Sequence, residues 1–171
     1  VLAVQVAKHG QDHPETLAAK VDLALLYSEQ GRFDDARKLL QETIESCTRV
    51  AGPEHRDTLI ALGNYSVLLQ SEGKFDDAMK VNDQVLAIQT RTLGPRHPAT
   101  LLTKNNRVAL LQAKEQYAEA DALVRELHEE VSQVLGPDHT TTLLLANNMA
   151  MSDFHLGKFE EAERQLKALY E

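Results

Sequence analysis

The stretch Leu-Leu-Tyr-Ser-Glu-Gln-Gly-Arg-Phe-Asp-Asp-Ala, residues 25–36, decides the fold because its second half recurs at fixed intervals. Gly-Lys-Phe-Asp-Asp-Ala follows at 73–78 and Gly-Lys-Phe-Glu-Glu-Ala at 157–162, one and three steps of 42 residues further along. An internal period of about 20–50 residues is typical of solenoids, in which each repeat buries its apolar face against its neighbours. The rest of the chain is therefore expected to follow the same register.

Other positions keep this step in four copies, with no insertion or deletion between them. The repeating columns are Gly10, Gly52, Gly94 and Gly136; His13, His55, His97 and His139; Thr16, Thr58, Thr100 and Thr142; Phe33, Phe75, Tyr117 and Phe159; and Ala36, Ala78, Ala120 and Ala162. A further glycine column, at 31, 73 and 157, has one exception, Glu115. We expect structural roles here, because small alanines allow close helix packing and glycines allow tight turns.

Within each copy, apolar residues three and four positions apart predict two amphipathic helices. In the first copy, one helix is expected from about Pro14 to Glu29 and a longer one from about Phe33 to Val50. The sequence therefore predicts an all-α fold, an α-solenoid of stacked antiparallel helix pairs with a concave and a convex surface. We expect a single domain over 1–171, with 1–9 ending a preceding repeat and four repeats at 10–51, 52–93, 94–135 and 136–171.

The composition excludes several classes of protein. Of the 171 residues 43% are apolar, which is too many for a disordered chain. The formal charge of −8 makes the chain a poor nucleic-acid binder, because phosphate contacts need a basic surface. No run of about 18 apolar residues could span a membrane, and the single cysteine, Cys47, excludes an internal disulfide. We expect a cytoplasmic protein that binds neither nucleic acid nor membrane.

The quoted motifs, together with Leu-Gly-Pro-Arg-His-Pro-Ala-Thr at 93–100, resemble the tetratricopeptide repeat in the 42-residue form of the kinesin light chain family. The resemblance covers the whole chain. It implies a scaffold that binds proteins or short extended peptides in a concave groove lined by the first helix of each pair. It also implies that the chain is not an enzyme, so no catalytic residue and no cofactor are expected.

Mapped by repeat position, the groove implied by this resemblance contains a run of amides and a few apolar side chains. The amides are Asn64, Asn105, Asn106, Asn147 and Asn148, and the apolar anchors are Val67, Met151 and Phe154. An asparagine amide both donates and accepts hydrogen bonds, so such a ladder can hold an extended peptide backbone. The alternative is that Asn64, Asn106 and Asn148 bond neighbouring helices and are structural.

A basic segment interrupts this acidic chain, because residues 84–114 hold five bases and no acid. The five bases are Arg91, Arg96, Lys104, Arg107 and Lys114. The segment predicts a local site for an acidic peptide, which the field of these cations would attract. The alternative is a solvated face, or an interface that complements acidic neighbours.

Two charged residues, Arg107 and Asp153, stand at repeat positions that are expected to lie in the core. A buried charge is costly unless it is paired. We expect the head of Arg107 to extend into the groove, as long basic side chains often do at an apolar surface. At Asp153 a rotated helix or a frayed last repeat is the simpler expectation.

No metal site is predicted. The four repeating histidines are one repeat apart and too distant to share an ion, so we expect a local role for each at the start of a first helix. His9 and His13 are four residues apart, but Gly10 interrupts the helix between them.

Two other functions are open. The chain could be a structural module that stacks on further repeats, or on another copy as a homo-oligomer, through apolar faces at its ends. The residues of those faces are Leu2, Val4 and Val6, and Leu166, Leu169 and Tyr170. It could also be a regulatory segment of a larger signalling protein.

Overall fold

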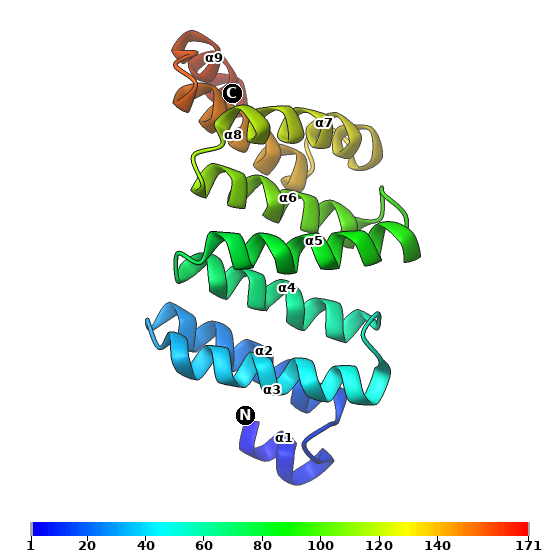
Figure 1. Cartoon of the computed structure of the whole chain (residues 1–171). Helices are drawn as coiled ribbons and strands as arrows, with labels where there is room; N and C mark the ends of the chain where they lie inside the picture. The colour runs from blue at the N-terminus through cyan, green and yellow to red at the C-terminus, as the bar shows by residue number, and fades with distance from the viewer. Residues whose placement is uncertain (1, 171) are drawn as a thin grey trace. The chain divides into compact units, whose positions relative to one another are not determined.

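The computed structural model describes residues 2–170, except for the side chain of Tyr170, and this part of the chain forms nine α-helices and no strand (Figure 1). The helices are α1 (Leu2–His9), α2 (Pro14–Glu29), α3 (Phe33–Ala51), α4 (Arg56–Ser71), α5 (Phe75–Thr92), α6 (Pro98–Ala113), α7 (Tyr117–Leu135), α8 (Thr140–His155) and α9 (Phe159–Tyr170). The all-α prediction is confirmed. The two helices predicted for the first copy are α2 and α3, of which α3 extends one residue further than expected.

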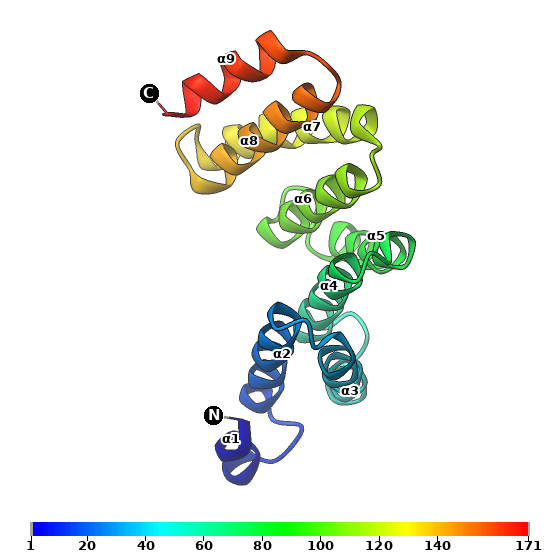
Figure 2. The ribbon, with the colours of Figure 1, turned by 90° about the vertical axis from the view of Figure 1, so that its left-hand side faces the viewer.

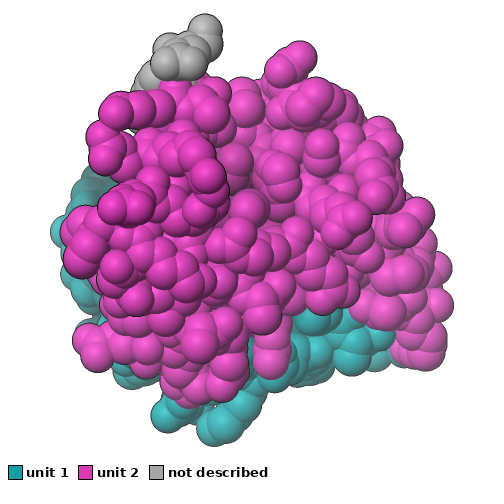
Figure 3. Space-filling model, turned by 90° about the horizontal axis from the view of Figure 1, so that it is seen from above, with its two compact units in different colours: residues 1–88 teal, residues 89–171 magenta. Residues whose placement is uncertain are grey.

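The chain divides into two compact units, unit 1 (residues 1–88) and unit 2 (residues 89–171), which Figure 3 colours teal and magenta. In unit 1, α2 packs on α3 and α3 on α4, and α2 also contacts α4 (Figure 2). In unit 2, α6, α7, α8 and α9 pack in chain order, and α6 also contacts α8. Within each unit, the first helix of one pair therefore lies against the first helix of the next.

The histidine and threonine columns build the loop that begins each first helix. Each histidine Nδ1 accepts a hydrogen bond from the backbone N–H two residues later, at 3.2–3.3 Å, and so caps the helix. Each threonine Oγ1 donates to the carbonyl of the glycine six residues earlier, at 2.7–2.9 Å. The predicted local role of the histidines is confirmed, and the threonines explain why the loop has a constant length.

The turn inside each helix pair requires a left-handed residue. Gly31, Gly73 and Gly157 have φ angles of 73–77°. Glu115 takes the same position between α6 and α7 with a φ of 60°, and it is the one non-glycine residue with positive φ among the described residues. The turn therefore keeps its geometry where the sequence departs from glycine, at a cost in backbone strain.

The alanine column is buried in all four copies, as close packing of the two helices of a pair requires. In unit 1 the core forms around Ala36 and Leu40 of α3 and Ala61 and Leu68 of α4. In unit 2 the fully buried residues of α7 and α8 are chiefly aliphatic. These cores hold the first helices in place and thereby position their exposed side chains.

Candidate functional site

Two of the predicted groove amides bond each other across neighbouring helices of unit 2. Asn148 Nδ2 on α8 donates to Asn105 Oδ1 on α6, at 3.1 Å. Gln112, two turns further along α6, donates from Nε2 to the Asn148 carbonyl at 3.1 Å and to Ser152 Oγ at 3.0 Å. A polar seam therefore joins α6 to α8, and sequence reasoning identified its asparagines as groove residues but not Ser152.

The remaining amides are placed differently. Asn64 Nδ2, in unit 1, donates to the Ile60 carbonyl of its own helix at 2.9 Å, so this bond does not join two helices. Asn106 and Asn147 are half-buried on α6 and α8. Asn148 thus makes the kind of bond between neighbouring helices that the structural alternative predicted, whereas Asn64 makes a bond that neither interpretation predicted. The groove roles of the five amides stay predictions.

The three predicted apolar anchors are exposed. Val67 lies on α4 of unit 1, and Met151 and Phe154 lie on α8 of unit 2. The ring of Phe154 meets the ring of Phe159 edge to face, with centroids 5.4 Å apart. Exposed apolar side chains of this size are available to a partner, although their role as anchors stays a prediction.

The basic segment is partly engaged within unit 2. Lys104 Nζ lies 2.8 Å from Glu130 Oε2 of α7, and both side chains are largely buried. Arg107 is half-buried on α6. Because Glu130 neutralises Lys104, this base contributes less to an attraction for acidic ligands than the sequence suggested. This contact between Lys104 and Glu130 is what the alternative interpretation predicts, in which the basic segment complements acidic neighbours.

Asp153 is fully buried and paired, and neither a rotated helix nor a frayed repeat is needed to explain it. Its carboxylate accepts from Arg125 Nη2 at 2.5 Å, Lys158 Nζ at 3.0 Å and Gln165 Nε2 at 2.9 Å. Burial acts to raise the pKa of Asp153, but these hydrogen bonds and charges outweigh it, so the pKa lies below its ordinary value. Asp153 therefore ties α8 to α7 and α9.

Unit 1 has a related ionic cluster that sequence reasoning missed. The carboxylate of Glu72 is almost buried between Arg37 of α3, with which it forms an ion pair, and Lys74, whose Nζ lies 2.6 Å away. Burial acts to raise the pKa of Glu72, but the two cations lower it on balance. The acid and the arginine are 35 residues apart, so no local sequence pattern links them.

A pocket of about 380 Å³ opens in unit 1 between α2, α3 and α4. Its lining includes the apolar side chains of Leu17, Val21 and Ile60, the thiol of Cys47, and acidic residues. Sequence reasoning did not predict this pocket. The signal that could have found it is the small size of the residues at its floor compared with their counterparts in a later repeat.

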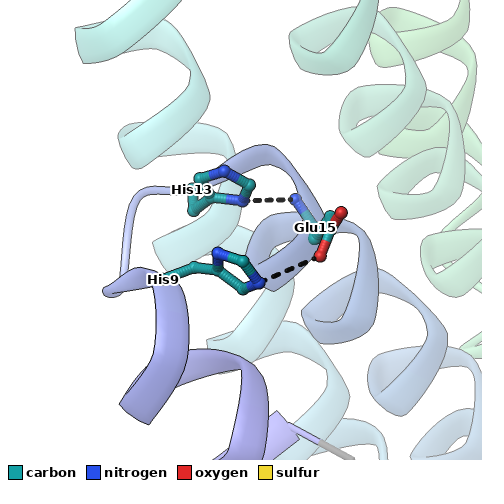
Figure 4. Close-up of side chains that lie close together, drawn as sticks. All are labelled: His9, His13 and Glu15. Carbon is teal, nitrogen blue, oxygen red and sulfur yellow. Dashed lines mark hydrogen bonds and ion pairs between the residues drawn. The ribbon is translucent and has the colours of Figure 1, made fainter.

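His9, His13 and Glu15 lie together beside the start of α2, with candidate metal-ligand atoms within 4.8 Å of one another (Figure 4). The histidine rings stack at 4.4 Å, and His9 Nε2 lies 3.3 Å from Glu15 Oε2. His13 Nδ1 already caps α2. Gly10 interrupts the helix between the two histidines, as expected, because α1 ends at His9 and α2 begins at Pro14. Nearly parallel stacked rings direct their nitrogens side by side rather than at one ion, so the prediction of no metal here stays as it was.

The family model for the tetratricopeptide repeat matches residues 1–48, 15–90 and 99–171. The chain belongs to the tetratricopeptide repeat family. The capped first helices, tight turns and buried alanine column described above are thus the elements of tetratricopeptide repeats, here of the 42-residue kinesin light chain-like type.

Solved structures share this tetratricopeptide repeat fold. A Podosopora anserina kinesin light chain-like protein of nearly identical TPR-like repeats matches with a TM-score of 0.75 at 25% identity, covering 99% of this chain and 80% of that one. A second crystal structure of that protein, a single-residue variant, gives a TM-score of 0.78 at 24% identity, with the same coverage. BtubC (BKLC) from P. vanneervenii gives 0.73 at 17% identity, and the match spans 91% of this chain and 62% of that one.

Two further searches, one of curated proteins and one of this chain's own helices, have negative results. A search of curated proteins finds no match. Among the described residues, no helix is both long enough and apolar enough to cross a membrane.

Proposed function

We propose that this tetratricopeptide repeat chain is a protein-interaction scaffold that binds an extended segment of a partner protein along α6 and α8. Proteins of this repeat family are generally interaction scaffolds rather than catalysts. The observation that carries the proposal is the bond between Asn105 and Asn148, which places amides from two successive first helices side by side. Exposed Met151 and Phe154 continue along α8 from this pair.

The chemistry of this face suits a peptide backbone. An amide pair offers donors and acceptors that an extended chain can use without a particular side chain. Apolar side chains beside it would bury those of the peptide and supply affinity. A preference for acidic peptides rests on the basic segment 84–114 and is reduced by the pairing of Lys104 with Glu130.

The test is a peptide-library screen on the full chain, repeated with the Asn105→Ala/Asn147→Ala variant. We expect the double variant to weaken binding of selected extended peptides at least tenfold, whereas Gln133→Ala, at an exposed amide on α7, leaves it unchanged. High salt should weaken binding if acidic side chains are selected, because exposed charges are screened. Binding that is indifferent to the double variant would contradict the proposal for this face.

A second function, stacking on another copy, is favoured by exposure at the last helix pair. Leu143 of α8 is 41% exposed, whereas Leu17 and Leu101, at the same repeat position, are 5% and 3% exposed. Phe159 is exposed, whereas Phe33 at the same position is half-buried. At the first helix Val4 is exposed and Leu2 and Val6 are half-buried, as are Leu166 and Leu169 of α9, while the side chain of Tyr170 lies outside the described residues.

Light scattering after size exclusion, over a range of concentrations, tests this second function. Head-to-tail stacking would give a mass that grows with concentration, because such contacts do not close on themselves. Leu143→Glu/Phe159→Glu should abolish the growth, and Leu102→Glu, at an exposed leucine on α6, should not. A monomer at all concentrations would contradict self-assembly. A regulatory role in a larger protein and a cytoplasmic location stay predictions.

A further inference from the structure

The unit 1 pocket has an apolar floor. Val21 of α2 and Cys47 of α3 line it as almost fully buried residues. Thr43, also in the lining, donates its hydroxyl to the Leu39 carbonyl of its own helix at 2.7 Å, so that its polar group is satisfied. Ile60 of α4 is partly exposed at the pocket. A volume of about 380 Å³ falls within the range of ligand sites and exceeds that of a single aliphatic side chain.

Three carboxylates surround this floor. Glu15 and Asp22 of α2 and Asp57 of α4 all belong to the lining, and all three are at least partly exposed. Glu15 faces His9 at 3.3 Å and Asp57 faces His55 at 3.7 Å, but a neutral imidazole leaves the carboxylate charge uncompensated. The rim is therefore negative whenever these histidines are unprotonated.

The thiol of Cys47 responds to the same environment. Burial raises the pKa of Cys47, and the nearby charge of Asp57 raises it further. Lys20 opposes this effect, but its ammonium is buried and bonded to Gln11 at 3.5 Å, outside the pocket lining. At the Cys47 thiol, the charge of Asp57 therefore acts more strongly than that of Lys20.

The corresponding place in unit 2, 84 residues later, lacks each of these features. Where unit 1 has Thr43 and Cys47, unit 2 has Leu127 and Val131, which are larger and fully buried. The acidic rim is also missing, since the counterparts of Glu15, Asp22 and Asp57 are Ala99, Asn106 and Thr141. Small floor residues and acidic rim residues therefore occur together in unit 1 and are both absent from the equivalent repeat.

We propose that the pocket between α2, α3 and α4 binds an apolar side chain flanked by lysine or arginine in a segment of a partner protein. The inference rests on the proposed function, because it assigns a second, chemically different site to the same scaffold. The apolar floor would bury the anchor side chain, and the rim would attract the flanking cations. Lysine and arginine suit such a rim, because their aliphatic stems can cover the pocket edge while their charged ends reach the carboxylates.

Three peptide probes of equal length test this assignment on the full chain. The first is acetyl-Arg-Lys-Leu-Lys-Arg-amide, the second has Glu in place of every base, and the third has Gly in place of Leu. Each carries a fluorophore for anisotropy. We expect the first to bind at least tenfold more tightly than either of the others, and its affinity to fall as salt screens the rim.

Variants that place unit 2 residues at the equivalent positions of unit 1 test whether the basic probe binds at the pocket. Ala18→Leu introduces the residue that unit 2 carries at this position, Leu102, and should weaken the basic probe at least tenfold by filling the pocket. Glu15→Ala/Asp22→Asn/Asp57→Thr should have a similar effect by removing the rim. The matched control is Glu126→Gln/Glu129→Gln/Asp138→Asn, which removes three exposed charges from unit 2 and should change affinity less than twofold.

A fluorescent reporter gives an independent readout, because the chain has no tryptophan. The emission of Ile60→Trp should shift when the basic probe binds, whereas that of Leu144→Trp, the equivalent position in unit 2, should not. The assignment would be overturned if the chain bound the basic and acidic probes with equal affinity. It would also be overturned if the unit 2 charge control weakened binding of the basic probe as much as the rim variant does.

The outcomes for the two proposals are distinct. If library peptides bind and the Asn105→Ala/Asn147→Ala variant weakens them, but the basic probe does not bind at the pocket, the proposed function stands and this inference is overturned. A reporter shift that appears with protein concentration alone means that a second copy covers the pocket, which also overturns it. Failure of every peptide to bind anywhere overturns both.

Discussion

Units 1 and 2 contain the same tetratricopeptide repeats 84 residues apart, yet they differ at the place where two first helices meet over a second helix. Unit 1 has Thr43 and Cys47 beneath a pocket, and unit 2 has the larger, buried Leu127 and Val131. The helices α2, α3 and α4 begin and end at residues equivalent to those of α6, α7 and α8. A few side-chain volumes therefore decide where this repeat scaffold is hollow, although the helices around the place have the same lengths in both units.

The units also differ in how they fix the turn of their last helix pair. At one repeat position unit 1 has the buried Leu69, and unit 2 has the buried Asp153 with its three hydrogen-bond partners. Unit 1 instead pairs Glu72 with Arg37 and Lys74. Both units thus have an ion cluster near this turn, centred on Glu72 after α4 in unit 1 and on Asp153 within α8 in unit 2.

Truncating the buried acid should have the largest effect. Asp153→Ala should lower the free energy of unfolding by about 3–5 kcal/mol, because it leaves the partners of a buried ion cluster unpaired. Asp153→Leu, which copies Leu69 and Leu111, should cost clearly less, since its side chain fills the space that alanine leaves empty. Arg125 and Lys158 are partly exposed and can reach water in either variant. Urea unfolding measures both. Equal costs for alanine and leucine would mean that loss of the charge, not packing, determines this position.

Enlarging the space in unit 2 should have the next largest effect. Leu127→Ala should cost about 2–5 kcal/mol, because it creates a cavity in a filled core. Thr43→Ala, at the same position in unit 1, should cost only about 1 kcal/mol, since the site already borders an open pocket. Chemical denaturation of the two variants provides the comparison. Similar losses would argue against a real difference in packing between the units.

Acid should weaken both ion clusters. The pKa values of Asp153 and Glu72 are lowered in the folded chain, so both carboxylates stabilise it above their unfolded pKa values, about 4. This stabilisation is lost as pH falls through the lower folded values. We expect the free energy of unfolding to decrease below about pH 4, and Asp153→Asn to flatten the decrease. Asp138→Asn, at an exposed acid, should leave the pH profile unchanged.

The smallest effect is expected at the turn. Glu115, with a φ of 60°, takes the place that Gly31 has in unit 1. Glu115→Gly should stabilise the chain by about 0.5–1 kcal/mol by relieving left-handed strain, less the entropy that glycine loses on folding. Gly31→Glu should destabilise it by a similar amount. Thermal unfolding of this pair checks the sign, and a destabilising Glu115→Gly would refute the strain argument.

Much of this architecture was predictable because repetition makes local signals reinforce one another. The 42-residue step, the helix pairs, the histidine caps and the glycine turns all depend on residues close together in the sequence. The groove asparagines were predictable as positions, but their bonds were not. Asn105 and Asn148 are 43 residues apart, and only the packing of α6 against α8 brings their amides together.

Local signals in the sequence were enough to predict an all-α repeat chain, the bounds of the first helix pair to within one residue, and the structural columns, because caps, turns and helix periodicity are local properties. Only the tertiary structure decided that Asp153 is paired rather than frayed, that Lys104 is neutralised by Glu130, and that unit 1 has an acid-rimmed pocket above Cys47. Those outcomes depend on which side chains from different helices meet and on the volume left between them, and neither quantity is encoded in any single segment.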